Sequence, residues 1–359
     1  MVPAALAVAE EQGASGADLL VALTAGSEVV TRLGMVAGAG FHVRGFHPTA
    51  VCGVFGAAAA ASRLRGLDAT ATTNALGIAG SMASGLLEFL SDGSATKRLH
   101  PGWAAHAGII ASRLAAHGAT GPATVLEGRF GLYAAYLDRT DVDLAASLDD
   151  LGERWETPNI AFKPYPACHY IHASLDALRE LHEADPIAPE DVESIVALTT
   201  EAGVSLVLEP LEAKHRPRSE YESKFSLPYS LASLLVRGNV DVSTYTDEAI
   251  TDTAVLDVAS RVSYEVKEYA TFPKAFPGGV RVTLRDGAVR ENELAYQRGG
   301  PDNPMTADEV AEKFRTNAGL ALSPDSVSRL ESAVMSIESE QRLDVLRELG
   351  GAARQEAVA

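Results

Sequence analysis

The chain has 359 residues, of which 47% are hydrophobic and 22% are charged, a composition typical of a folded globular protein and not of a disordered or fibrous one. Thirty Lys and Arg residues against 48 Asp and Glu residues give a formal net charge of -18, which disfavours nucleic acid and anionic membranes as partners. The same charge repels anionic ligands at long range, so a carboxylate ligand requires a local cluster of Lys, Arg or His.

The two cysteines, Cys52 and Cys168, are too few for a disulfide scaffold and favour the reducing cytoplasm. Apolar runs near the start are interrupted by Glu10, Glu11 and Asp18, so we expect neither a membrane span nor a signal peptide there. The sequence also lacks a Walker phosphate loop, a Gly-x-Ser-x-Gly elbow and a His-Glu-x-x-His metal motif.

Residues 3 to 156 are rich in Ala, Leu and Gly, a texture typical of packed helices. Leucines and valines recur at helical spacings between residues 18 and 36, which predicts an amphipathic helix there. Residues 50 to 64 and 104 to 116 are almost continuously small and apolar, which predicts two interior helices whose axes approach closely.

After Pro158 the pattern changes, and apolar residues alternate with polar ones over residues 262 to 266 and 280 to 284. These two segments predict half-buried strands, and Asp286-Gly287 predicts a tight hairpin turn after which residues 290 to 296 return as the partner strand. Helical texture resumes near Pro301, with a capping box from Thr306 to Glu309 and an amphipathic helix over residues 324 to 349.

The expected fold class is therefore α+β: a mainly helical domain with an inserted α+β lid domain, and C-terminal helices that return to the helical domain. We place the first helical part at residues 1 to 158, the lid at 159 to 302, and the returning helices at 303 to 359.

Two segments in the helical part concentrate polar residues in a way that packing alone does not require. His47-Pro48-Thr49 precedes the Ala-rich helix, so it marks either an anion site at a helix start or merely a helix cap. Residues 91 to 102 place hydroxyls and glycines around Thr96, Lys97 and Arg98, which makes this segment the strongest anion-binding candidate, or else a solvated loop.

Two further segments lie in the lid. Lys163, His169 and His172 are potential proton carriers near the domain junction, although either histidine can instead cap the next helix. Cys168 is between them, but a small buried thiol is the commoner role. Tyr229 can donate to a carboxylate, or it can be a core residue with a satisfied hydroxyl.

Taken in order, these segments resemble the MmgE/PrpD family, which includes 2-methylcitrate dehydratase, cis-aconitate decarboxylase and an iminodisuccinate epimerase. The resemblance runs from Pro3 to about Leu320 and is carried by five segments: GFHPTAVCG, GSMASGLLEFLSDGSATKRLHPGWAAHAG, FKPYPACHYIHASLDAL, ESKFSLPYSLA and RGGPDNPMTADEVAEKF. It implies a helical domain with an α+β lid, a cleft between them, homodimers formed through the helical domain, and chemistry without a metal or other cofactor.

The resemblance also implies roles for individual residues. It implies that His47, Lys163, His169 and Tyr229 are catalytic, with the register of the lid histidine open between 169 and 172. The residues expected to bind substrate are Thr96, Lys97 and His172.

The resemblance implies a cytoplasmic lyase that acts on a small di- or tricarboxylate, with 2-methylcitrate dehydration in propionate metabolism as the leading expectation. Cis-aconitate decarboxylation and iminodisuccinate epimerisation are the alternatives within the family. A non-catalytic paralogue that dimerises or binds carboxylates is the alternative of another class.

Family members usually carry a further segment before the first residues of this chain, with an Asp-Asp stretch and a His-Pro loop. If that segment is missing, we expect apolar side chains such as Leu6, Leu19 and Leu23 to be exposed. The chain would then dimerise or aggregate, and would turn over substrate more slowly than a longer form.

Overall fold

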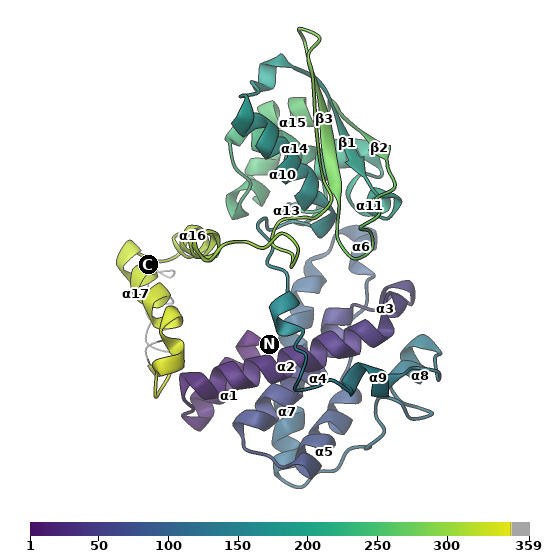
Figure 1. Cartoon of the computed structure of the whole chain (residues 1–359), viewed down its shortest axis with the longest axis vertical. Coiled ribbons are helices and arrows are strands. Elements are labelled where there is room, and N and C mark those ends of the chain that lie inside the picture. Colours follow the sequence, from purple (N-terminus) through teal and green to yellow (C-terminus); the bar gives the residue numbers. More distant parts are fainter. Residues whose placement is uncertain (345, 347–359) are drawn as a thin grey trace. The chain divides into compact units, whose positions relative to one another are not determined.

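A computed structural model describes residues 1–344 and 346 of the chain (Figure 1). Its contacts divide the chain into two compact units. The first unit comprises Met1–Pro158 and the described residues from Phe314 onward, and the second comprises Asn159–Lys313. The model confirms the expected α+β fold class, because a mainly helical chain carries one small mixed sheet.

The first unit is built from helices in the residues that the structure describes. In chain order they are α1 (Val2–Gln12), α2 (Gly16–Ala37), α3 (Gly40–Val43), α4 (Pro48–Leu64), α5 (Ala69–Gly80), α6 (Phe89–Asp92), the 3₁₀ turn η1 (Ala95–Arg98), α7 (Leu99–Ala116), α8 (Leu132–Leu137), α9 (Leu144–Leu148) and α17 (Pro324–Met335). Helix α16 (Ala307–Ala318) contains the boundary between the two units, which falls between Lys313 and Phe314.

Helices α4 and α7 run parallel and in close contact along their length. His47 and His100 meet at their N-terminal ends, and the Ser62 hydroxyl lies 3.3 Å from the Ser112 hydroxyl toward the other end. Alanine and glycine make this approach possible: a Cβ on Gly108 would lie 2.5 Å from the Cβ of Ala57. The small-residue pattern therefore predicts both the helices and their close packing correctly.

Helix α2 is the one described helix that is long and apolar enough to cross a membrane by length and composition, although the charged residues near the start had led us to expect no apolar run of that length. The packing of α2 favours a core helix instead. It lies against α4, and its buried residues include an ion pair between Glu28 and Arg32, which are 1% and 2% exposed. A buried charged pair suits a protein interior that supplies further hydrogen bonds.

The Arg32 guanidinium fixes the segment that leads out of the first unit. It donates to the Ser147 carbonyl at 2.6 Å and to the Arg154 carbonyl at 2.6 Å. Glu28 Oε1 in turn accepts from the backbone N–H groups of Glu156 and Thr157, at 2.8 and 2.7 Å. The pair thus satisfies backbone groups of residues 147–157, directly before the second unit begins.

The second unit contains the sheet, whose strand order is β2-β1-β3-β4. Strand β1 (Val192–Thr199) pairs parallel with β2 (Val262–Val266) and antiparallel with β3 (Gly278–Leu284), and β3 pairs antiparallel with β4 (Val289–Leu294). Helix α10 (His169–Ala184) packs on the sheet, with α14 (Leu227–Arg237) and α15 (Thr253–Ala259) beyond it (Figure 1). The other described α-helices that lie wholly in this unit are short: α11 (Glu201–Val207), α12 (Leu211–His215) and α13 (Glu220–Ser223).

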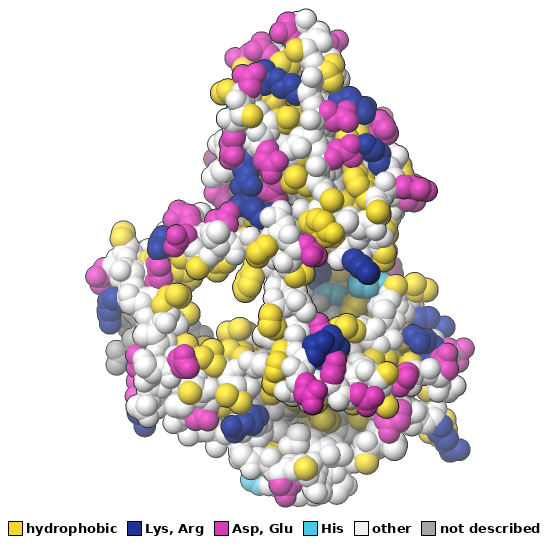
Figure 2. Space-filling view, viewed as in Figure 1, with side chains coloured by type: hydrophobic (Ala, Val, Ile, Leu, Met, Phe, Trp, Pro, Cys, Tyr) yellow, Lys and Arg dark blue, Asp and Glu magenta, His cyan; other side chains and the backbone are white. Residues whose placement is uncertain are grey.

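On the surface of the second unit, basic side chains lie beside acidic ones, so the visible face carries no patch of a single sign (Figure 2). Arg281, for example, joins Glu265 on β2 at 2.9 Å and also pairs with Glu291 on β4. Exposed pairs of this kind contribute little to stability, but they keep the edge strands charged, which discourages pairing with other chains.

The three predicted strands, the hairpin and the Thr306–Glu309 capping box are confirmed. The predicted helix over residues 324 to 349 is wrong in length, because α17 ends at Met335; residues 345 and 347 to 349 of that prediction lie outside the described residues. The expected exposure of Leu19 is also wrong: Leu19 is 3% exposed and belongs to a cluster that includes Leu343.

Replacing Gly108 with alanine tests the α4–α7 contact. The new methyl group would also lie 2.6 Å from the backbone nitrogen of Ala58, where no side chain can move aside. We expect the free energy of unfolding to fall by about 1 to 3 kcal/mol. The matched control is Gly102→Ala on the same helix, whose Cβ meets nothing within 4 Å; urea unfolding of the two variants should separate them clearly.

Replacing Arg32 with methionine tests the buried pair. Glu28 would keep its backbone donors but lose its counter-ion, so we expect a loss of about 3 to 5 kcal/mol in the free energy of unfolding. Arg113→Met is the control, because Arg113 is half-exposed and pairs with Glu11 at the surface. The control should lose no more than about 1 kcal/mol, and similar losses in both variants would contradict this account.

Candidate active site

The centre of the first unit's candidate site is a pair of imidazoles. His47 ends the loop before α4, and His100 lies in the first turn of α7, so the parallel packing of these helices brings the two rings together. Their Nδ1 atoms are 3.0 Å apart, and both side chains are buried. One Nδ1 must carry a proton and donate, and the other must accept.

The loop before α4 is held in place by a second loop. His47 N–H donates to the Gly85 carbonyl at 2.9 Å, and Leu87 N–H donates to the Gly45 carbonyl at 2.8 Å. Gly85 has a φ of +121°, which only glycine adopts readily, and it lets the loop approach the His100 ring. The glycines of both sequence segments therefore serve the geometry of the imidazole pair.

Both imidazoles are kept neutral by their surroundings. Burial, reinforced by the charge of Lys97, lowers the pKa of His47 to about 4, and the same two causes lower the pKa of His100. Burial disfavours the charged form of any imidazole, and a nearby ammonium group adds to that effect. A negative charge placed beside the pair would oppose both causes and allow a proton to bind.

A cavity of about 600 Å³ opens beside the pair. The side chains that line it include hydroxyls, an imidazole, aromatic rings and carboxylates, among them Ser84, Ser94, Thr96, His100, Trp103 and Asp92. Two predicted residues are near it: Thr96 contributes to the wall, and Lys97 Nζ lies 5.7 Å from the ring centroid of Phe89, another wall residue. The structure thus brings three predicted residues, His47, Thr96 and Lys97, to one region of the first unit.

The second candidate cluster lies at the start of α10. Lys163 Nζ donates to the Ala167 carbonyl at 3.0 Å, and the His169 and His172 rings meet with centroids 4.9 Å apart. His169 also stacks on Phe276 at 4.8 Å. The structure therefore gathers the three lid residues into one cluster in the second unit.

The two lid histidines differ in exposure. His172 is fully buried, its Nε2 lies 3.4 Å from the Ala167 carbonyl, and its Nδ1 has no hydrogen-bond partner among the described residues. His169 is only partly buried, yet burial and then Lys163 lower its pKa to about 4. The two rings are nevertheless alike in one respect, because the Nε2 of His169 is also buried without a hydrogen-bond partner among the described residues.

Tyr229 lies in the core of the second unit. Its side chain is fully buried, and its hydroxyl donates to the Thr244 carbonyl at 2.7 Å. The centroid of the Tyr245 ring lies 6.2 Å from that of Tyr229. These contacts are those of a core tyrosine with a satisfied hydroxyl, so they lend no support to a contact between Tyr229 and substrate.

His100 is the site residue that the sequence analysis missed. That analysis singled out Thr96, Lys97 and Arg98 in residues 91 to 102 and gave His100 no role. Its link to His47 spans 53 positions and depends on how two helices align. The signal that could have found it is the shared small-residue pattern of the two helices, read together with a histidine at the start of each.

Two observations narrow the chemistry. Among the described residues, no group of three or more His, Cys, Asp or Glu side chains is placed to hold a metal ion. Cys52 is buried, and burial raises the pKa of its thiol to about 12, so it does not provide a thiolate nucleophile near neutral pH.

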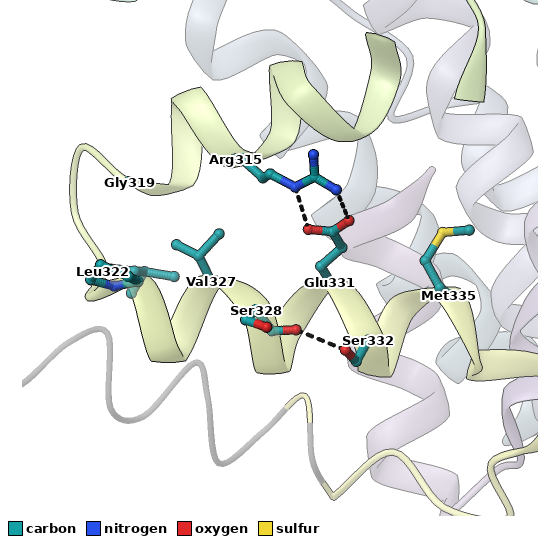
Figure 3. A pocket seen from close by; sticks show the side chains of 9 residues that line it. Arg315, Gly319, Leu322, Val327, Ser328, Glu331, Ser332 and Met335 are labelled. Atoms are coloured by element: carbon teal, nitrogen blue, oxygen red, sulfur yellow. Dashed lines mark hydrogen bonds and ion pairs between the residues drawn. The ribbon is translucent and has the colours of Figure 1, made fainter. Parts of the chain in front are cut away.

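A second cavity, of about 650 Å³, lies between α16 and α17 (Figure 3). Arg315 and Glu331 span it with two hydrogen bonds, at 2.8 and 2.6 Å, and Leu322, Val327 and Met335 supply apolar walls. Among the described residues of its wall, Arg315 and Glu331 are the only charged ones and neutralise each other, and none is a histidine. This cavity therefore offers fewer groups that could bind a charged ligand or transfer a proton than the cavity beside His100.

The fold and these clusters define a class: a mainly helical α+β protein that gathers two imidazoles near a lysine in each of its two units. The chain belongs to the MmgE/PrpD family, as the resemblance indicated. Residues 1–145 match the MmgE/PrpD N-terminal domain and residues 165–339 match the MmgE/PrpD C-terminal domain.

Three relatives show what the chain is similar to. A cis-aconitate decarboxylase-like protein of Aspergillus oryzae is 30% identical over 94% of this chain and 73% of its own length. Cis-aconitate decarboxylase of Homo sapiens is 31% identical over 93% of this chain and 69% of its own length. Cis-aconitate decarboxylase of Aspergillus terreus is 28% identical over 97% of this chain and 74% of its own length. These names support a lyase as the coarse class of this protein.

The lowered pKa of His47 predicts how stability depends on pH. Above its ordinary value of 6.5, the ring is neutral in both folded and unfolded chains. As pH falls from 6.5 toward about 4, the His47 ring binds a proton in the unfolded chain but not in the folded chain, so the free energy of unfolding falls. We expect His47→Gln to remove about 1 to 3 kcal/mol of this loss, measured by urea unfolding across that pH range.

The control for this measurement is His117→Gln, because His117 is exposed at the end of α7. It should keep the pH dependence of the unaltered protein. An unchanged pH dependence in His47→Gln would show that the ring is not held neutral in the fold.

Proposed function

We propose that the protein decarboxylates cis-aconitate or a closely similar unsaturated tricarboxylate. The observation that carries the proposal is the buried imidazole pair of His47 and His100, held beside Lys97 at the wall of a cavity. The names of the relatives support the same substrate.

Decarboxylation makes two demands on a protein. When the carbon–carbon bond to the departing carboxylate breaks, its electron pair moves into the conjugated system, and a carbon atom then takes up a proton. The remaining carboxylates need cationic partners, and the developing charge needs hydrogen-bond donors. Lys97 and an imidazole N–H meet these demands in the first unit, and Lys163 and His169 offer the same chemistry in the second.

The N-terminus of α4 adds a positive electrostatic potential, which favours a bound anion. No side chain caps its first turn, and the aligned peptide dipoles place partial positive charge at a helix N-terminus. The carboxylates of Asp92 and Glu88 in the cavity wall oppose an anion, so Lys97 must outweigh them for a polycarboxylate to bind.

The leading expectation from the sequence, dehydration of 2-methylcitrate, is less well supported. It requires a base to remove a proton from carbon and an acid to assist the departing hydroxide. The imidazoles can supply both, but the relatives reported above carry decarboxylase names. A non-catalytic paralogue is disfavoured by the assembled pair of imidazoles and its cavity.

The direct test is to incubate the purified protein with cis-aconitate and follow carbon dioxide release together with the unsaturated dicarboxylate product by proton NMR. Parallel reactions contain 2-methylcitrate and iminodisuccinate. Carbon dioxide release from cis-aconitate supports the proposal, whereas loss of water from 2-methylcitrate alone would replace it with the dehydratase.

A lysine substitution tests the cationic partner. We expect Lys97→Ala to raise the KM for cis-aconitate by roughly 10- to 100-fold, since a lost charge-assisted hydrogen bond costs about 1.5 to 3 kcal/mol. Arg98→Ala is the matched control: it removes the adjacent cation, whose side chain is exposed, and should change KM less than about threefold. Equal small effects in both variants would remove residues 91 to 102 from the site.

A further inference from the structure

The two imidazoles of the pair are not equivalent toward the cavity. His100 contributes to its wall, whereas His47, which also lies within the described part of the chain, is not a wall residue. Phe89 meets the His100 ring edge-on, with centroids 5.9 Å apart, and the Gly85 backbone passes so close that an added Cβ there would lie 3.4 Å from the His100 Nδ1. A ligand in the cavity therefore meets His100 first.

The hydrogen bond of the pair decides which nitrogen can serve a ligand. Nδ1 of His100 is engaged with Nδ1 of His47 at 3.0 Å, so Nε2 is the nitrogen left for contact in the cavity. If His47 accepts at Nδ1, His100 can carry protons on both nitrogens at once. Two fully protonated rings would instead place two N–H groups face to face, so the pair accommodates one added proton and not two.

We propose that His100 is the catalytic residue that delivers the proton to carbon, and that His47 is a positioning residue that fixes the His100 ring through the Nδ1 contact. This inference rests on the proposed decarboxylation. The bond to the departing carboxylate breaks, carbon dioxide leaves, and the electron pair enters the conjugated system. Carbon then takes the proton from His100 Nε2, which leaves a neutral imidazole that solvent protonates again.

Asparagine variants separate the two roles, because the asparagine amide lies near the position of Nδ1 and has no equivalent of Nε2. His100→Asn keeps a partner for His47 but removes the proton donor, so we expect kcat to fall at least 100-fold with KM changed less than about threefold. His47→Asn keeps a partner for His100 and should retain more than about a tenth of kcat. His47→Leu removes that partner and should approach His100→Asn.

The exposed His117 provides the matched control, and His117→Asn should keep the activity of the unaltered protein. If His47→Asn loses activity as fully as His100→Asn, a hydrogen-bond partner at Nδ1 is not sufficient, and the assignment of His47 as a positioning residue is overturned. If His100→Asn remains active, the proposal is overturned directly.

A binding measurement decides the question without turnover. In protein labelled with ¹⁵N-histidine, addition of cis-aconitate should shift the Nε2 resonance of His100 more than that of His47, with assignments from the asparagine variants. A shift confined to His47, or no shift at either ring, overturns the role of His100. Absence of turnover by the unaltered protein overturns the proposed function, and the NMR shift then still decides whether His100 contacts the ligand.

Discussion

The parallel packing of α4 against α7 is the constraint on which the candidate site of the first unit depends. Small residues at the contact let the helices approach closely along their whole length. Because the helices are parallel, their starts meet, and those starts carry His47 and His100. Parallel helices also place like dipole ends together, which is unfavourable on its own and becomes favourable when an anion binds there.

A second constraint acts where the chain leaves the first unit. Residues 147–157 form little regular structure beyond the end of α9, so their backbone groups need partners from elsewhere. Arg32 and Glu28 supply those partners from a single face of α2. A helix that reads as apolar by composition thus carries the two charges that fix an irregular segment, and composition alone cannot reveal this.

The sequence predicts regular elements well where one local pattern determines them. The Ala-rich helices, the hairpin at Asp286-Gly287 and the capping box at Thr306 all follow from short-range chemistry. Strand β1 was missed although it is central, because its second half is nearly all buried and shows no alternation. The same limit applied to Tyr229, where the sequence left two roles open and only the structure shows the contacts with Tyr245 and Thr244.

The sequence indicated which residues could belong to the site, but it did not indicate which of them contact one another. The loops around His47 and Lys97 stood out because they combine polar groups with glycine, and the structure brings them together. The contact between His47 and His100 could not be predicted, because it depends on the alignment of two helices and not on any spacing within one. Chemistry that arises from tertiary alignment is therefore the part that requires a structure.

The electrostatics of the pair connect substrate charge to proton uptake. Lys97 and burial together keep both imidazoles neutral in the free protein. A tricarboxylate beside Lys97 offsets that ammonium charge and adds negative potential at the rings, so it favours the protonated form. Linkage makes the effect reciprocal: a proton on the pair strengthens polyanion binding by the same factor. In the decarboxylation proposed above, the acid would therefore be formed by the substrate that uses it, at rings that burial and Lys97 keep neutral in the free protein.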